Sequence, residues 1–145
     1  MIVPDTNLLV YAHHPDAQLH SPAKRWWQAL LDGNELIGLP WIVTTGFIRV
    51  STNVRMLEQP TTTEVAVRVA NDWFRYPHVF PLNPGSRHMV FLSEALAAVR
   101  IGGNLVPDAH IAALAIEYQA EVHSSDSDFA RFPGLRWKNP LDESR

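Results

Sequence analysis

Short apolar runs alternate with longer segments that carry apolar residues at helical spacing, and this alternation constrains the fold more than any other feature. Strands that alternate with helices are typical of a parallel sheet covered on both faces. The chain has 145 residues, which is the length of one domain. We therefore expect a single α/β domain over residues 1–145, with three layers (α/β/α) and a short-stranded, mostly parallel central sheet. The five runs are MIVPD (1–5), ELIGLP (35–40), HVFPL (78–82), EVHSS (121–125) and LRW (135–137).

Residues that favour helix starts lie between these runs. Helix starts are predicted at Ser21, at Thr61, which is followed by Glu64 in a capping-box pattern, and at Ser86. Residues 5–7, Asp-Thr-Asn, predict a turn rather than a helix start after the first strand. Segment 41–53 also has helical spacing, but it carries Gly46 in its middle. A glycine there costs about 0.5–1 kcal/mol relative to alanine and requires a local reason.

Composition excludes several kinds of site. The chain has no Cys, so disulfides, thiolate zinc sites and a cysteine nucleophile are ruled out. Its seven His residues lack the spacing of a zinc-binding helix motif. No apolar run is long enough to span a membrane and the N-terminus lacks the basic region of a signal peptide, so we expect a cytoplasmic protein. Because the net charge is −3, binding to nucleic acid would depend on local arginines and bound metal.

Carboxylates follow two of the predicted strands and open one of the helices. Asp5 follows the first strand, Asp126 and Asp128 follow the fourth, and Asp108 begins a helix. Ligands of open α/β sheets bind beyond the carboxyl ends of the strands, so these acids are expected to meet there. Acids this close repel unless a cation joins them, and an all-oxygen site suits Mg²⁺ or Mn²⁺. Each acid alone also fits a turn or a helix cap.

The same residues carry a resemblance to a known family. The segments are PDTNLLVYA (4–12), LVPDAHIAALAIEYQAEVHSSDSDF (105–129) and FPGLRWKNP (132–140). Together they resemble PIN-domain ribonucleases and, more narrowly, the toxins of VapBC-type toxin–antitoxin pairs. The resemblance covers the whole chain. It implies a PIN-like α/β/α domain, an endoribonuclease that needs Mg²⁺ (Mn²⁺ can substitute), an RNA substrate, a VapB-like antitoxin as partner and a homodimer.

The resemblance also assigns roles to individual residues. Three acids would hold the metal, and a fourth would complete the catalytic set. Nearby polar side chains would orient these acids. The metal ligands are Asp5, Asp108 and Asp126, the fourth acid is Asp128, and the orienting residues are Asn7 and Ser125. Apart from the resemblance, the candidates for contacts with RNA phosphates are Arg49, Arg55, Arg68 and Arg75, of which Arg49 is selected; arginines on exposed helix faces are also often simply solvated.

One position departs from the family pattern. The family usually has a Glu three residues before the arginine, and here Gly46 stands three residues before Arg49. One hypothesis is an active ribonuclease in which water or Asp128 takes the vacant coordination position. The alternative is a catalytically impaired PIN-like module that binds RNA or antitoxin. A phosphatase that uses the same metal chemistry on small molecules is a third hypothesis.

The adjacent tryptophans Trp26 and Trp27, with Leu30 and Leu31, make an apolar stripe wider than one core face needs. Wide stripes occur on buried helices, so packing is one explanation. A groove for a partner protein is the other.

Overall fold

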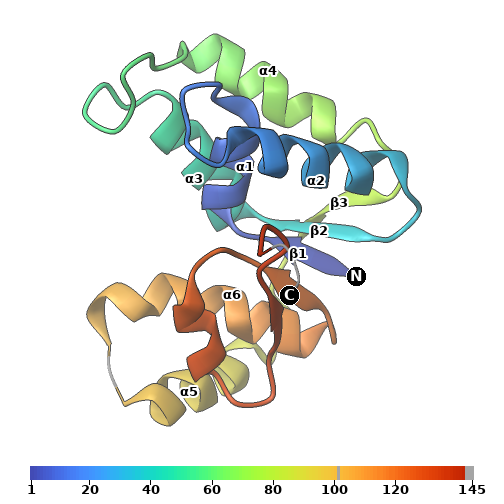
Figure 1. Ribbon diagram of the computed structural model, residues 1–145. Helices are drawn as coiled ribbons and strands as arrows, with labels where there is room; N and C mark the ends of the chain where they lie inside the picture. The colour runs from blue at the N-terminus through green and yellow to red at the C-terminus, as the bar shows by residue number, and fades with distance from the viewer. Residues whose placement is uncertain (101, 143–145) are drawn as a thin grey trace.

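A five-stranded sheet forms the centre of the computed structural model, which describes residues 1–100 and 102–142 (Figure 1). Its order is β3-β2-β1-β4-β5, and every pair of neighbouring strands is parallel. The sheet is thus entirely parallel, and the predicted three-layer α/β/α architecture is confirmed. The strands are β1 (Ile2–Pro4), β2 (Ile37–Pro40), β3 (Val79–Leu82), β4 (Glu121–His123) and β5 (Arg136–Lys138).

Helices cover both faces of the sheet. Helices α1 to α4 lie on one face, above the sheet in Figure 1, and α5 and α6 lie on the other. Within the described residues, no helix is long and apolar enough to cross a membrane. The α-helices are α1 (Thr6–His13), α2 (His20–Asp32), α3 (Trp41–Ser51), α4 (Thr63–Trp73), α5 (His88–Val99) and α6 (Val106–Glu117). Two short 3₁₀ helices are η1 (Gly103–Leu105) and η2 (Ser127–Arg131).

The core lies on both sides of the central strands. Val3 and Val122 on the neighbouring strands β1 and β4 are fully buried, as expected for strands that have helices on both faces. Trp27 on α2 is also buried in this core, whereas Trp26 beside it is half-buried and packs against the core from outside. Packing therefore explains Trp27.

The predicted turn at residues 5–7 is wrong, because helix α1 begins at Thr6 directly after β1. The side chain of Asp5 caps this helix by accepting a hydrogen bond from the Thr6 backbone N–H at 2.8 Å. Asp, Thr and Asn favour both turns and helix starts, because their side chains bond to nearby backbone groups in either case. The buried residues Leu8 and Leu9 then continue the helix into the core.

The other predicted helix starts are one or two residues away from the observed ones. Helix α2 begins at His20, before Ser21, and α5 begins at His88, two residues after Ser86. In α4 the cap is Thr62, whose hydroxyl accepts a hydrogen bond from the Val65 backbone N–H at 3.2 Å. The predicted capping box of Thr61 and Glu64 is therefore wrong, because three consecutive threonines offer equivalent caps and packing selects one of them.

Candidate metal centre

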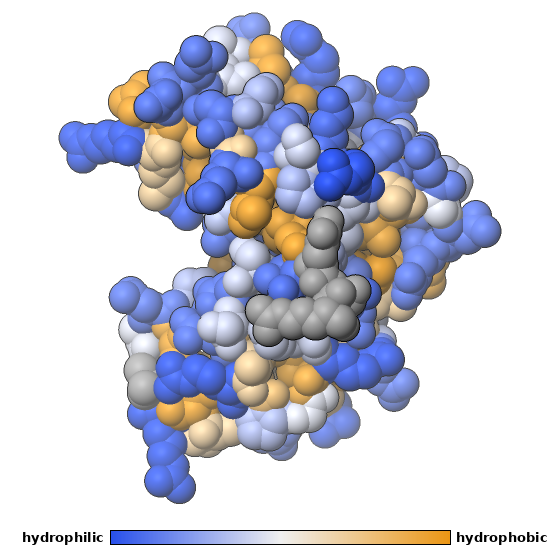
Figure 2. All heavy atoms as spheres, viewed as in Figure 1, coloured by the Kyte–Doolittle hydropathy of each residue, from blue (hydrophilic) through white to orange (hydrophobic). Residues whose placement is uncertain are grey.

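The carboxyl ends of the two central strands bring the predicted acids to one edge of the sheet. Asp5 directly follows β1, and Asp126 lies three residues after the end of β4, its neighbour. Asp108 is in the first turn of α6, and Asp128 is in the first turn of η2. Figure 2 shows the surface hollowed on the left, between the α1–α4 layer and the α5–α6 layer, on the side where the strands end.

Three of the four acids form a cluster. One carboxylate oxygen each of Asp108, Asp126 and Asp128 lies within 4.8 Å of the others. Burial, and after it the charges of the other three acids, raises the pKa of Asp108 from 3.8 to about 6. This is the effect expected when like charges share a partly buried site without a counter-ion. The cluster therefore favours either a proton or a cation.

Asp5 stands beside this cluster and is held differently. It is 7% exposed, and both of its carboxylate oxygens accept hydrogen bonds. Thr6 donates its backbone N–H to one oxygen, and the Ser124 hydroxyl donates to the other at 2.7 Å. Burial raises the pKa of Asp5, while these two hydrogen bonds act in the opposite direction. A carboxylate has about four lone-pair sites, so Asp5 keeps acceptor capacity after both bonds.

Ser124, which the sequence analysis did not select, links the two strand ends. Its hydroxyl donates to Asp5 and accepts a hydrogen bond from the Asp126 backbone N–H at 2.9 Å. Ser124 is completely buried, whereas its predicted neighbour Ser125 is only half-buried. The signal is the strand register: Pro4 pairs with His123, so the next residues along the two strands, Asp5 and Ser124, lie opposite each other.

A chain of hydrogen bonds fixes the end of β4 from the α2 side. The Trp26 indole N–H donates to His123 Nδ1 at 3.0 Å, and His123 Nε2 lies 2.9 Å from Glu121 Oε1. Because the indole can only donate, His123 Nδ1 accepts this bond. His123 therefore carries its proton on Nε2, which donates a hydrogen bond to Glu121. Burial lowers the pKa of His123, which agrees with this neutral form. The backbone carbonyl of His123 in turn accepts a hydrogen bond from the Asp5 backbone N–H, with an N···O distance of 2.9 Å. This series of hydrogen bonds therefore reaches from α2 to the acid site.

Gly46 faces the start of α1, next to Asp5. A Cβ atom at this position would lie 2.9 Å from Thr6 Oγ1, closer than real Cβ contacts occur. Thr6 Oγ1 also donates to the Val43 carbonyl on α3 at 3.3 Å. The glycine in mid-helix is thus explained, since it lets α1 and α3 approach closely. A Glu at position 46 would have to displace the Thr6 side chain.

The remaining predicted site residues are Arg49, Asn7, Ser125 and Asp128. Arg49 is exposed on α3 and forms no ion pair with any described residue. Asn7 is exposed in the first turn of α1. The side-chain hydrogen bond to Asp5 comes from Ser124 rather than from Asn7 or Ser125. Asp128 lies 3.9 Å from the Arg131 guanidinium, which leaves its carboxylate only loosely paired.

Comparison with solved structures gives the same fold. VapBC2 from Rickettsia felis, bound to a DNA fragment, aligns with a TM-score of 0.64 and 20% identity over 95% of this chain and 98% of that chain. FitAcB from Neisseria gonorrhoeae aligns with a TM-score of 0.71 and 18% identity over 98% of this chain and 99% of that chain. At these identities the structures establish the architecture alone.

Sequence comparison identifies the family. Ribonuclease VapC33 of Mycobacterium tuberculosis is 41% identical over 143 residues, covering 99% of this chain and 100% of that protein. Ribonuclease VapC37 of the same organism is 39% identical over 140 residues, with 97% of each chain covered. Residues 2–135 match the PIN domain. With nearly the whole chain matched in sequence and the parallel α/β/α fold in place, the protein belongs to the PIN domain family.

Proposed function

We propose that this protein is the toxin of a type II toxin–antitoxin pair and acts as a divalent-metal-dependent endoribonuclease. The observation that carries the proposal is the cluster of Asp108, Asp126 and Asp128 at the carboxyl edge of a PIN-domain sheet. Relatives that are 39% and 41% identical over nearly their whole length are named ribonucleases. Residues 1–145 would act as one catalytic unit in the cytoplasm, where cellular RNA is found.

The donor set fits Mg²⁺ or Mn²⁺. All candidate ligands are carboxylate oxygens, which are the ligands these hard cations prefer. Burial and, after it, the charges of Asp5, Asp126 and Asp128 raise the pKa of Asp108, and a bound cation would offset these charges. Asp108, Asp126 and Asp128 would hold the ion, and Asp5 would contribute its remaining lone pairs directly or through water. Ser124 and Thr6 would keep the Asp5 carboxylate in one orientation.

In the reaction these residues would position charge rather than form a covalent bond with the substrate. A divalent cation held by the acids would activate water and offset the charge that grows on the phosphate. Without a cation, burial and the neighbouring acids raise the pKa of Asp108 to about 6, so a proton and a divalent cation would compete for this carboxylate. The exposed guanidinium of Arg49 would bind a phosphate oxygen of the RNA. Asn7 and Ser125 would help to orient the acids, Asn7 near Asp5 and Ser125 next to Ser124.

The proposed partners follow from the relatives. Two solved structures with this fold are the complexes VapBC2 and FitAcB, so we propose a VapB-like antitoxin for this chain as well. RNA is the proposed substrate because the sequence relatives are ribonucleases. A homodimer remains a prediction of the family resemblance.

The experiment that tests the function is a cleavage assay with purified protein, a panel of RNAs and Mg²⁺ or Mn²⁺. We expect cleavage that EDTA abolishes and that the cation restores. RNA or antitoxin binding without cleavage at any cation concentration would favour the impaired binding module instead. Cleavage by a Gly46→Glu variant, where the wild type shows none, would support the same alternative. Hydrolysis of small phosphate esters but not of RNA would favour the phosphatase hypothesis.

A further inference from the structure

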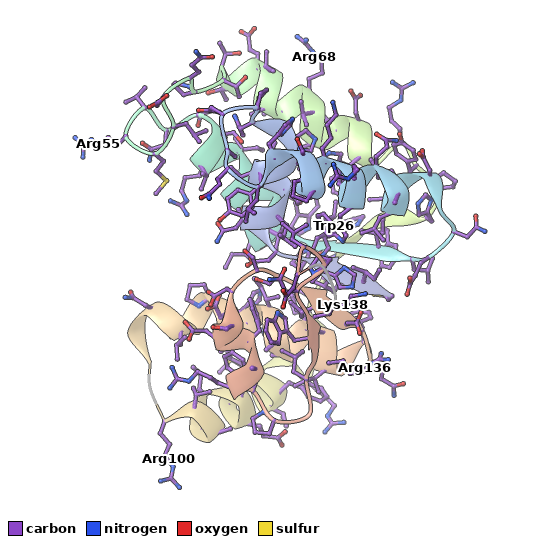
Figure 3. The ribbon with its side chains drawn as sticks, in the orientation of Figure 1. Trp26, Arg55, Arg68, Arg100, Arg136 and Lys138 are labelled. Atoms are coloured by element: carbon purple, nitrogen blue, oxygen red, sulfur yellow. The ribbon has the colours of Figure 1, made fainter. Side chains whose placement is uncertain are left out.

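A pocket of about 520 Å³ lies between α2 and the strands β4 and β5, and its lining includes two residues that follow β5. Trp26 on α2 and Lys138 on β5 both line it and lie next to each other in Figure 3. None of the four candidate catalytic acids belongs to its lining. Pockets that hold small ligands have volumes of about 300–1,000 Å³, so this one, which we call the Trp26 pocket, has room for a small organic ligand.

Trp26 gives the pocket an aromatic wall. Other apolar residues of the lining are Pro22, Ala29, Leu30, Pro140 and Leu141. The ring of Trp26 is half-buried, and the 3.0 Å hydrogen bond from its indole N–H to His123 Nδ1 holds it in one orientation. Core packing accounts for Trp27 but leaves Trp26 at the edge of the core. An aromatic ring fixed at the wall of a pocket is the kind of surface on which nucleic-acid bases stack.

The pocket carries two acids and two cations, and within the described part of the chain only the acids have partners. Glu35 lies 3.8 Å from the N-terminal ammonium, and Glu121 accepts the hydrogen bond from His123 Nε2 at 2.9 Å. Arg25 and Lys138 are exposed and form no ion pair with a described residue. Their charges can therefore attract an anion, and phosphate is an anion that both Arg and Lys bind.

Glu121 determines which base suits the pocket. Its side chain is 36% exposed, and only one of its oxygens accepts from His123. Because a carboxylate has about four lone-pair sites, Glu121 can accept further N–H groups. Guanine offers two donors side by side, N1–H and the N2 amino group, which match the two oxygens of a carboxylate. Adenine, cytosine and uracil place an acceptor next to each donor on the same edge, and a carboxylate oxygen repels that acceptor.

We propose that the Trp26 pocket binds a guanine nucleotide, with the base stacked on Trp26, its N1–H and N2–H donated to Glu121, and its phosphate held by Arg25 and Lys138. The nucleotide is either free or a unit of single-stranded RNA, since both present the same base and phosphate. Binding at this pocket requires no cation at the acid cluster, so the proposal stands apart from the cleavage reaction.

The test is isothermal titration calorimetry in EDTA, which measures binding in the absence of metal-dependent cleavage. The ligands are 5′-GMP, 5′-AMP and two oligonucleotides of equal length, an oligouridylate and the same chain with one central guanosine. We expect GMP to bind at least about tenfold more tightly than AMP. Glu121→Gln puts an N–H donor against the base and should abolish this preference, whereas the control Glu94→Gln, at an exposed acid on α5, should keep it.

Two further variants test the phosphate contact and the stacking. Arg25→Gln/Lys138→Gln should weaken GMP binding at least about tenfold, and added salt should weaken binding to the wild type. The control Arg87→Gln/Arg100→Gln removes the same charge at exposed positions on the other face of the sheet (Figure 1) and should leave the Kd unchanged. GMP should quench the tryptophan fluorescence of the wild type but not that of Trp26→Phe. Circular dichroism verifies that each variant is folded.

The oligonucleotides distinguish the two sources of the nucleotide. Binding of GMP alone identifies the ligand as a free nucleotide, and binding of the guanosine-containing chain in preference to plain oligouridylate identifies it as a unit of RNA. The proposal is overturned if neither GMP nor the guanosine-containing chain binds, if AMP binds as tightly as GMP, or if the pocket variants behave like their controls.

Discussion

Asp5 and Asp108 lie at the same edge of the sheet, yet the chain holds them in opposite ways. Asp5 is buried, and hydrogen bonds from Thr6 and Ser124 occupy both of its oxygens. Asp108 is less buried, opens α6, and has a pKa raised to about 6. Hydrogen bonds hold the Asp5 carboxylate in place, whereas burial and repulsion from neighbouring acids disfavour the charge of the Asp108 carboxylate.

The difference separates two tasks. A carboxylate fixed by a serine and a helix N-terminus supplies a rigid reference point for a site. A carboxylate whose charge is opposed by other acids supplies free energy that only a proton or a cation can release. We therefore expect changes at Asp108 to act mainly on cation binding, and changes around Asp5 to act on both stability and geometry.

The largest expected effect is that of Asp108→Asn on RNA cleavage. The substitution keeps the shape of the side chain but removes the charge that a hard cation requires. Changing a residue that only orients a metal ligand already costs about 10–100-fold, so we expect at least about 100-fold slower cleavage when a ligand itself is changed. Initial rates with saturating Mn²⁺ measure this. A folded variant that cleaves at the wild-type rate would remove Asp108 from the site.

Ser124→Ala sharpens the comparison from the Asp5 side. It removes the donor to Asp5 and the acceptor for the Asp126 backbone N–H in a fully buried position. Leaving buried polar groups unpaired costs about 1–3 kcal/mol, which denaturant unfolding measures. Cation affinity should fall about 10–100-fold as well. The control is Ser125→Ala, which should change stability by less than about 0.5 kcal/mol. Equal losses in both variants would contradict the assigned role of Ser124.

The pH dependence of stability measures the contribution of Asp108 without an activity assay. Because the folded pKa of Asp108 is raised from 3.8 to about 6, the folded state binds the proton more tightly than the unfolded state does. This contribution to stability is therefore present in acid and is lost as the pH rises through about 6. We expect a loss on the order of 1 kcal/mol after allowing for solvent screening. Melting temperatures in EDTA should show this loss. Asp108→Asn should reduce it and leave the part that comes from Asp5, whose pKa is raised as well.

The smallest effect concerns the contact of Gly46 with Thr6. Gly46→Ala should gain about 0.5–1 kcal/mol of helix propensity but place a Cβ 2.9 Å from Thr6 Oγ1. We expect the crowding to outweigh the gain, so that the single variant is less stable than the wild type. In a Thr6→Ala background the same substitution should stabilise the protein. A double-mutant cycle with no coupling between the two positions would show that contact with Thr6 is not the reason for a glycine at position 46.

The sequence predicted the architecture and the position of the acids because both depend on local patterns. Alternating apolar runs and helical stripes define the layers, and Asp residues at strand ends meet wherever the strands are parallel neighbours. It missed helix α1, since Asp-Thr-Asn is equally suited to a turn. It also missed Ser124, because choosing between two adjacent serines depends on the register of β1 against β4. The bond from Trp26 to His123 joins residues 97 positions apart, and no local pattern indicates it.

The central claim is that this acid cluster holds a divalent cation, and electron paramagnetic resonance of Mn²⁺ tests it most directly. The spectrum of free Mn²⁺ is followed while wild-type protein and the Asp108→Asn variant are added in turn. We predict that the wild type removes the free-ion signal, that Mg²⁺ restores it by competition, and that the variant removes much less of it. A free-ion signal that stays at full intensity with excess folded wild-type protein would contradict the account.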